Sequence, residues 1–357
     1  MLGRVFGKRA ARLEWTDIFV YSLGALIVGV VIVGSIMTIQ KGTYGARQWF
    51  DLVLFGLTLG SIYSLIALGY TLVYGILRMI NFAHSEVFMS GPYAAYYLAI
   101  SLAASGLVAE NPALALLMII GFAMIVSTLI AITVERLAYR PLRHAPTLVP
   151  LITAIGASFV LQYTFRGFFG PAIKVYPEFP ILEQKIILGE FQVTSLQIFV
   201  IVIAALMMLG LHLFVQYTKV GKAMRAVAED RETAALMGIN VNRIIVTTFA
   251  LGGALAGAAG VLFILVFNQV TFYMGFYPGV KAFTAAVLGG IGNIPGAMLG
   301  GIFLGVIESL GPNLILDGLG IPAPNQLKDA LAFVMLVLVL ILRPAGILGE
   351  RLTEKKA

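Results

Sequence analysis

The sequence lacks cysteine, and of its 357 residues only three are histidine and only 11% are charged. Without cysteine the chain forms no disulfide, no thiolate metal site and no cysteine nucleophile. The histidines, at positions 84, 144 and 212, are too widely spread to suggest a metal centre or a hydrolase site. The sequence therefore predicts no catalytic residue, no metal site and no cofactor.

The sequence also lacks a phosphate-binding loop of the type G-x-x-x-x-G-K-[ST]. Gly221 and Lys222 are followed by Ala223, and the upstream glycine of the pattern is missing. The chain is therefore not expected to hydrolyse ATP by that route. Carboxylates within apolar runs are also few, with Glu86 and Glu308 the candidates, which gives little support for a proton relay.

Apolar residues, in contrast, make up 60% of the chain, which is more than one soluble core can bury. The sequence predicts an integral membrane protein, an all-α polytopic helical bundle. Runs of about 20 apolar residues, long enough to cross a bilayer, lie near residues 17–39, 50–76, 86–107, 112–135, 148–169, 194–217, 244–268, 295–316 and 326–343.

A shorter apolar run, residues 278–291, lies between the glycine- and proline-containing stretches "YPG" and "GGIGNIPG". The net charge of +7 indicates topology rather than nucleic-acid binding, because the basic residues cluster between apolar runs, as in cytoplasmic loops. Placing these clusters and both termini in the cytoplasm requires the short run to cross, which gives about ten spans. Residues 170–193 then lie outside.

Breaks of this kind at membrane depth are typical of a translocation path, although glycines also let helices pack closely. The candidate path residues in and after the short run are Thr284, Gly289, Gly290, Gly292 and Asn293.

The first run follows a basic stretch and is too long for the apolar part of a signal peptide. Residues 1–46 are therefore predicted to hold a cytoplasmic basic segment and an extra, retained anchor helix. Residues 47–349 are predicted to form the transmembrane domain, and residues 350–357 a cytoplasmic tail.

The long polar loop 219–243 contains "AMRAVAEDRETAALMG", a composition that favours a short helix ending at Gly238. Met224 and Val227 are candidates for its apolar side. One interpretation is an amphipathic loop on lipid headgroups. The other is a docking element for a cytoplasmic partner, which the acidic pair Glu229 and Asp230 favours because it suits an anionic lipid surface poorly.

The stretch "RMINFAHSEVFMSG" places polar residues between the second and third runs. We expect Asn81, His84, Ser85 and Glu86 at a cytoplasmic turn within reach of water, with His84 closing a hydrogen-bond network with Glu86. The favoured interpretation is a polar cap on two helix ends. The alternative is an inner gate of the translocation path.

Glu308 lies in the outer half of its predicted span, where an isolated carboxylate costs about 2.5 to 3.5 kcal/mol on insertion scales. We predict that it pairs with Lys281 or Lys328, and prefer Lys281 because it belongs to the short run. The alternative is that both lysines extend to headgroups while Glu308 meets water.

Three long blocks and a short closing one carry a resemblance: "GLTLGSIYSLIALGYTLVYGILRMINFAHSEVFMSGPYAAYYL", "RAVAEDRETAALMGINVNR", "GVKAFTAAVLGGIGNIPGAMLGGIFLGVIESL" and "RPAGILG". From about Phe50 to Gly349 the chain resembles the permease subunit of branched-chain amino acid ABC importers, the high-affinity leucine, isoleucine and valine system. The resemblance implies the prokaryotic inner membrane and partners: a second related permease subunit, two cytoplasmic ATP-binding subunits that hydrolyse ATP and an extracytoplasmic solute-binding protein. It also implies an ATPase-coupling helix that includes Ala228, Glu229, Asp230, Ala234 and Gly238.

Two departures accompany the resemblance. The family pattern usually reads "NFAHGE", whereas Ser85 stands here in place of the glycine, and the first apolar run precedes the family's usual start. A family permease for urea, short amides or other neutral amino acids stays open as an alternative. So does a stand-alone secondary transporter, which needs its own coupling-ion site and no cytoplasmic docking helix.

Overall fold

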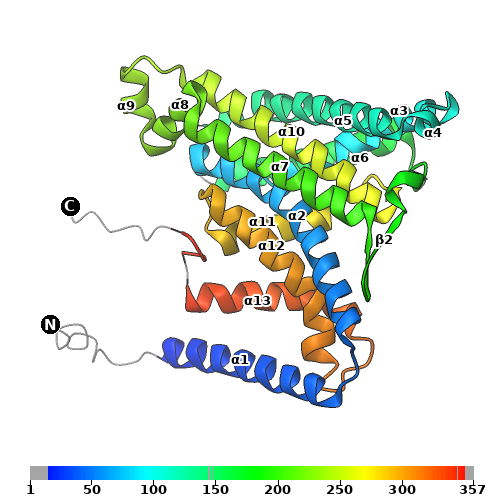
Figure 1. Cartoon of the computed structure of the whole chain (residues 1–357). Helices are drawn as coiled ribbons and strands as arrows, with labels where there is room; N and C mark the ends of the chain where they lie inside the picture. Colours follow the sequence, from blue (N-terminus) through cyan, green and yellow to red (C-terminus); the bar gives the residue numbers. More distant parts are fainter. Residues whose placement is uncertain (1–14, 144, 147, 344, 350–357) are drawn as a thin grey trace.

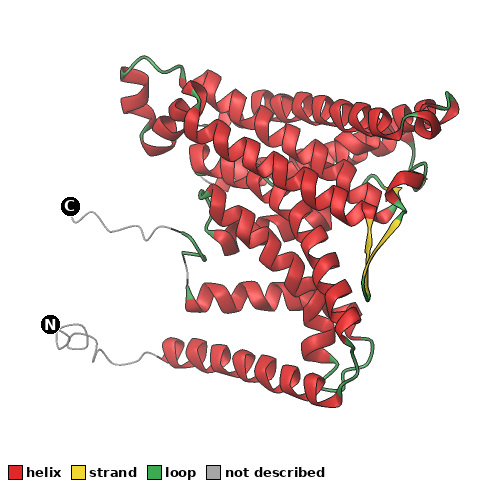
Figure 2. Ribbon diagram, in the orientation of Figure 1, coloured by secondary structure: helices red, strands yellow, loops and turns green. Residues whose placement is uncertain are grey.

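The structure, a computed structural model, describes residues 15–143, 145–146, 148–343 and 345–349. The predicted tail, residues 350–357, and the basic segment before Trp15 lie outside the described residues. The described part is a helical bundle with very little strand (Figure 1, Figure 2). Nine of its helices are long and apolar enough to cross a membrane. The prediction of an all-α polytopic bundle is confirmed.

The nine long helices correspond to the nine predicted runs. They are α1 Trp15–Lys41, α2 Ala46–Leu77, α3 His84–Ala104, α5 Pro112–Val134, α6 Leu148–Phe169, α7 Ser195–Tyr217, α10 Val241–Phe267, α12 Ile294–Gly311 and α13 Lys328–Leu342. The short run forms α11, Phe276–Gly289, whose 14 residues span about 21 Å. Shorter helices are α4 Leu107–Glu110, α8 Lys219–Glu229 and α9 Arg231–Leu236.

The remaining elements are single turns and strands. Two π turns, Glu135–Tyr139 and Pro312–Leu316, extend α5 and α12, and short 3₁₀ turns cover Arg140–Leu142, Pro180–Leu182 and Pro324–Leu327. The loop between α6 and α7 forms the hairpin β2 Lys185–Leu188 and β3 Phe191–Thr194. Before it, β1 Lys174–Val175 pairs antiparallel with β4 Gln269–Val270, which precedes α11. The sequence had not predicted these strands.

The core of the bundle is centred on α2 and α10. In the most apolar 18-residue stretch of each helix, 72% of the residues are buried. Small residues bring α2 and α12 into backbone contact. A Cβ at Gly60 would lie 2.7 Å from the Cα atom of Ile302, and one at Gly305 would lie 2.2 Å from the nitrogen of Gly60. Packing of small residues is the usual way in which membrane helices approach closely, because lipid offers no hydrophobic drive to associate.

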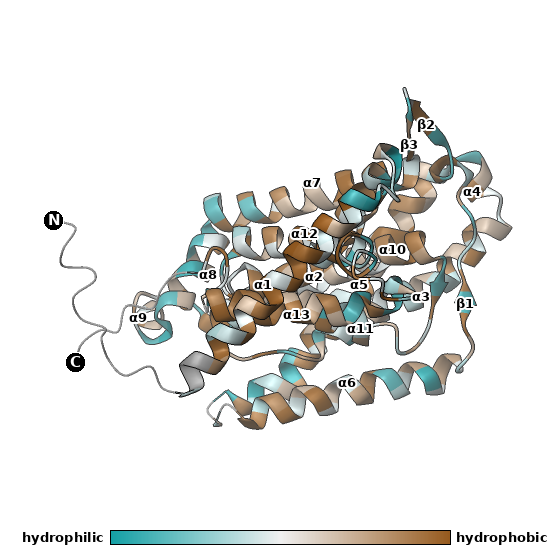
Figure 3. Ribbon diagram, turned by 90° about the horizontal axis from the view of Figure 1, so that it is seen from below, coloured by the Kyte–Doolittle hydropathy of each residue, from teal (hydrophilic) through white to brown (hydrophobic). Residues whose placement is uncertain are grey.

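The extra helix α1 lies at the edge of the bundle beside α13 (Figure 1), its ribbon is mostly in the hydrophobic colours (Figure 3), and many of its apolar side chains are exposed. It is nevertheless attached to the bundle. A Cβ at Gly34 would lie 2.3 Å from the carbonyl oxygen of Ile315, and Lys41 Nζ donates to the carbonyl oxygens of Asp317 and Gly318 at 3.0 and 3.2 Å. A lysine is favourable there because it satisfies carbonyls at the end of a helical segment.

Candidate functional site

The polar stretch after α2 lies inside the protein and not at a water-exposed turn. Asn81, His84 and Glu86 are 3%, 2% and 0% exposed. The ring of His84 lies against Gly69 of α2, where an added Cβ would be 2.1 Å from Nε2. Gly69 is eight residues, or about 12 Å, before the end of α2 at Leu77. The prediction that water reaches these side chains is therefore wrong, because the chain turns back into the bundle before α3 begins.

The turn back into the bundle begins at Arg78, which closes α2 in a left-handed conformation with φ 55°. At the other end of the segment, the N-cap residue of α3 is Ala83, which makes no side-chain cap hydrogen bond. The expected polar cap on two helix ends is thus not formed by these side chains. Non-helical backbone at membrane depth is tolerated where protein surrounds it, as it does here.

Glu86 and His84 do not share a hydrogen-bond network, contrary to expectation. Glu86 Oε1 accepts from Gln162 Nε2 at 2.7 Å and from Ser158 Oγ at 3.3 Å, both on α6. His84 instead packs edge-on against Tyr70, with ring centroids 4.9 Å apart. The sequence does contain an indication of these partners. Ser158 and Gln162 are polar, four residues apart and part of an apolar helix, so they lie on the same helix face.

The structure brings Lys281 and Glu308 together inside the bundle. Lys281 Nζ lies 2.7 Å from Glu308 Oε1, and their side chains are only 8% and 2% exposed. Lys281 Nζ is also 2.7 Å from Asp329 Oδ1 at the start of α13, on a side chain that is 42% exposed. Sequence reasoning considered the neighbouring Lys328 and missed Asp329. One lysine thus lies between two carboxylates and ties α11, α12 and α13 together.

The glycines at the end of α11 lie in close backbone contacts. A Cβ at Gly289 would lie 2.0 Å from the carbonyl oxygen of Gly296, and one at Gly290 would lie 2.5 Å from the nitrogen of Gly349. Gly290 and Gly292 have φ of +107° and +95°, which favour glycine. These contacts agree with the interpretation that the glycines of this segment let the helices pack closely.

Thr284 and Asn293, the polar candidates of this segment, both have local partners. Thr284 Oγ1 donates to the carbonyl oxygen of Val280 at 2.9 Å and is buried. Asn293 caps α12, because its Oδ1 accepts from Gly296 N at 3.0 Å, and its Nδ2 donates to the carbonyl oxygen of Leu348 at 2.9 Å. Asn293 therefore links the break between α11 and α12 to the segment after α13.

The polar loop 219–243 forms two helices, not one. Asp230 adopts an extended conformation between α8 and α9 and caps α9, with Oδ1 accepting from the backbone nitrogens of Glu232 and Thr233 at 2.9 and 3.1 Å. Hydrogen bonds from the side chain and backbone of Thr233 lower the pKa of Asp230 below its usual value. The expected single helix is broken because the aspartate bonds more favourably as an N-cap than in a helix interior.

Gly238 ends α9, as predicted. It has φ +83°, its nitrogen donates to the carbonyl oxygen of Ala235, and Ile239 N donates to that of Ala234, both at 3.0 Å. This is the Schellman pattern of a glycine-terminated helix. Ala234 is buried, whereas Leu236 and Met237 are 88% and 79% exposed, so the tip of α9 presents apolar side chains outward.

The two helices of the loop are joined to the end of α2. Arg231 Nε donates to the carbonyl oxygen of Ile76 at 3.0 Å, and an Arg78 guanidinium nitrogen donates to that of Ala228 at 3.4 Å. Met224 and Val227, on the inner side of α8, are buried as expected. These contacts join α8 and α9 to the end of α2, which with α10 is the most buried of the long helices.

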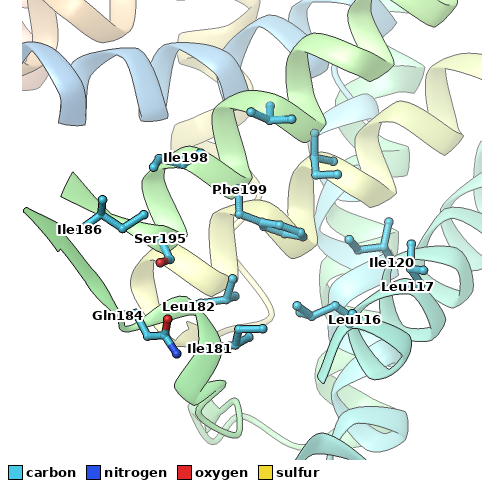
Figure 4. Close-up of a pocket in the computed structure, with 13 residues that line it drawn as sticks. Leu116, Leu117, Ile120, Ile181, Leu182, Gln184, Ile186, Ser195, Ile198 and Phe199 are labelled. Carbon is cyan, nitrogen blue, oxygen red and sulfur yellow. The ribbon is translucent and has the colours of Figure 1, made fainter. Parts of the chain in front are cut away.

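A groove of about 540 Å³ lies apart from these residues, between α5, α7 and the loop that precedes β2 (Figure 4). Its lining is apolar except for Gln184 and Ser195, and it includes none of the candidate path residues. Leu117 on its rim is 65% exposed. The groove lies on the outside of the bundle, where a membrane protein meets lipid or a neighbouring subunit.

Residues 52–340 match the family model of the permease component of branched-chain amino acid transport systems. The chain belongs to this family. It is 45% identical over 305 residues to the high-affinity branched-chain amino acid transport system permease protein BraD of Pseudomonas aeruginosa, covering 84% of this chain and 95% of the relative. It is 42% and 41% identical over 323 residues to the LivH proteins of Salmonella typhimurium and Escherichia coli, covering 88% of this chain and 99% of each relative. As a branched-chain amino acid permease component, the chain is a multi-pass membrane protein of a transport system and not an enzyme.

Proposed function

We propose that the chain is the membrane-spanning permease subunit of an ABC importer that moves branched-chain amino acids into the cytoplasm of a prokaryotic cell. The proposal rests mainly on the geometry of the α8–α9 loop, in a chain that belongs to the permease family. Its broken, capped geometry and exposed apolar tip suit a groove on another protein, and two arginine contacts connect it to α2.

The proposed partners follow from this role. Two cytoplasmic ATP-binding subunits hydrolyse ATP, and one of them receives the α8–α9 loop, whose coupling residues are Ala228, Glu229, Asp230, Ala234 and Gly238. A second, related permease subunit completes the membrane path, and an extracytoplasmic solute-binding protein delivers the amino acid. The apolar outer surface of the permease is in contact with membrane lipid.

The proposed orientation places both termini in the cytoplasm. The first turn of α1 and the last turn of α13 lie at the same end of the molecule as α8 and α9 (Figure 1). The loop containing α8 and α9 is rich in lysine and arginine, which supports a cytoplasmic location. The β2–β3 hairpin lies at the opposite end and faces outside (Figure 1).

The proposed inner gate contains Asn81, His84 and Glu86. Their burial at the start of α3 supports a role inside the bundle rather than at its surface. Thr284, Asn293 and the glycines between α11 and α12 are proposed to border the same path, where the chain breaks between two helices.

Uptake by proteoliposomes tests the proposal. Vesicles that contain the four membrane-bound subunits and enclosed ATP should accumulate labelled leucine when the solute-binding protein is added outside. They should not do so without ATP or without this chain. Inhibition of leucine uptake by valine but not by urea or acetamide would favour the branched-chain reading over the alternative family substrates. Leucine uptake by this chain alone, driven by an ion gradient, would contradict the proposal.

A further inference from the structure

The first turns of α3 and α11 meet inside the protein. A Cβ at Gly275, the N-cap residue of α11, would lie 2.2 Å from the carbonyl oxygen of Ser85, and one at Gly279 would lie 2.3 Å from Ser85 Cβ. Neither α3 nor α11 has a side-chain cap at its N-terminus. Two positive helix ends therefore converge at one buried point.

Each helix reaches this point by a non-helical approach. α3 follows a non-helical stretch after α2, and the ring of His84 in its first turn reaches Gly69, about 12 Å from the end of α2. The chain before α11 leads from β4, which pairs with β1 beside the middle of α3 at Tyr93, Tyr96 and Tyr97, to Ser85 within a few residues. Discontinuous helices whose N-termini meet within a membrane bundle are the typical setting of a transporter's substrate site.

Glu86 provides the second observation. Its Oε1 accepts from Gln162, Ser158 and Ser85, whereas its Oε2 is buried without a hydrogen-bond partner among the described residues. A Cβ at Gly275 would lie 3.0 Å from Oε2, so this oxygen points at the start of α11. Within the described part of the chain no lysine, arginine or histidine forms an ion pair with Glu86.

We propose that this meeting point is the site where the permease holds an α-amino acid during transport. The substrate carboxylate binds the N–H groups of Ser85 and Tyr277, the first-turn donors of α3 and α11 that have no backbone acceptor in the part of the chain that the structure describes, and the substrate ammonium group binds Glu86 Oε2. The inference rests on the proposed function and adds to it the site and the chemistry that recognises the substrate.

The charges of the site suit a zwitterion. Two helix N-termini contribute about half a positive charge each, and Glu86 contributes one negative charge. The sum is close to zero, so a neutral zwitterion finds one partner for each of its charged groups. In this structure the site is closed, because Ser85 lies against Gly275 and Gly279. Separation of α3 and α11 opens it, as in other alternating-access movements.

The proposal can be tested with leucine and with two compounds that each carry only one of its two charged groups. The membrane complex, purified without the solute-binding protein, is heated with leucine, with 3-methylbutylamine, which lacks the carboxylate, or with 4-methylpentanoate, which lacks the ammonium group. Each probe at millimolar concentration should raise the unfolding temperature of the wild-type chain. Glu86→Gln should abolish the shifts given by leucine and the amine and preserve that given by the acid. Glu86→Asp, which keeps the charge, should preserve part of all three.

Glu110→Gln, an exposed glutamate at the end of α4, is the matched control and should behave as wild type. In proteoliposomes, Glu86→Gln should lower leucine uptake at least tenfold, which corresponds to about 1.4 kcal/mol. No shift with leucine in the wild type, or equal losses with all three probes in Glu86→Gln, overturns the site. Leucine uptake by the wild-type importer tests the proposed function separately, so the two failures are distinguishable.

Discussion

Lys281 lies between two carboxylates, and this arrangement predicts that two substitutions, Lys281→Met and Glu308→Gln, lower the free energy of unfolding by different amounts. Lys281→Met leaves Glu308, whose side chain is 2% exposed, as an uncompensated charge inside the bundle. Removing one partner of a buried ion pair typically costs about 3 to 5 kcal/mol. Glu308→Gln should cost less, about 1 to 3 kcal/mol, because Lys281 keeps Asp329 at 2.7 Å and only hydrogen bonding around position 308 changes. Lys281→Met is therefore the more harmful of the two.

The assay is thermal unfolding of the purified, fluorescently tagged chain in lipid nanodiscs. The order of unfolding temperatures should be wild type, then Glu308→Gln, then Lys281→Met. The double variant Lys281→Met with Glu308→Gln should regain part of the loss, because it no longer contains a buried unpaired charge. The exposed Lys328→Met is the matched control and should unfold with the wild type.

Exchanging the two charges gives a further check. Lys281→Glu with Glu308→Lys restores the pair, and should recover some of the stability and uptake lost in Glu308→Lys. The recovery should be incomplete, because the new carboxylate at position 281 faces Asp329. Adding Asp329→Asn should increase it. If Lys281→Met unfolds no earlier than Glu308→Gln, and neither combination recovers anything, the reasoning about the buried charge is refuted.

Three more predictions concern coupling and packing. Gly238→Pro should abolish leucine uptake while the chain stays in the membrane, because proline requires φ near −65° and Gly238 has φ +83°. Gly238→Ala should reduce uptake less. Normal uptake by both variants would contradict this prediction. Glu229→Ala should uncouple ATP hydrolysis from uptake, which parallel assays would measure; unchanged uptake together with co-purification of the ATP-binding subunits would argue against a coupling role. Gly289→Ala should lower the unfolding temperature, because its Cβ meets the carbonyl oxygen of Gly296 at 2.0 Å, whereas Gly210→Ala, with open space around it, should not.

The spans were predictable because run length and mean hydropathy are local properties. Each long apolar run became a helix whose ends lie within a few residues of the prediction, and α6 matches at both ends. The short run was also helical, with its glycines in close contacts. Hydropathy averages, however, carry no information about depth. The polar residues after α2 therefore looked like a surface turn, although the chain folds back into the bundle there.

The polar partners were harder to predict because they come from distant parts of the chain. Glu86 and Gln162 are 76 residues apart, and nothing between them in the sequence indicates that α6 faces the start of α3. Asp329 was missed for a related reason, since it lies beside a lysine that looked like the better partner. The break at Asp230 is a local feature. It arises because aspartate prefers the N-cap position to a helix interior, and at this residue the preference outweighs the helix propensity of its neighbours.

The short pairing of β1 with β4 has a mechanical consequence. It joins the loop after α6 to the loop after α10 through backbone hydrogen bonds, so a movement of one loop is resisted by the other. Lys174, in β1, lies 5.2 to 5.7 Å from the ring centroids of Tyr93, Tyr96 and Tyr97, so the paired strands contact the middle of α3. Only a few residues separate β4 from the first turn of α11. The loop after α6 is thus linked, through β1, β4 and a short connection, to the point where α3 and α11 meet.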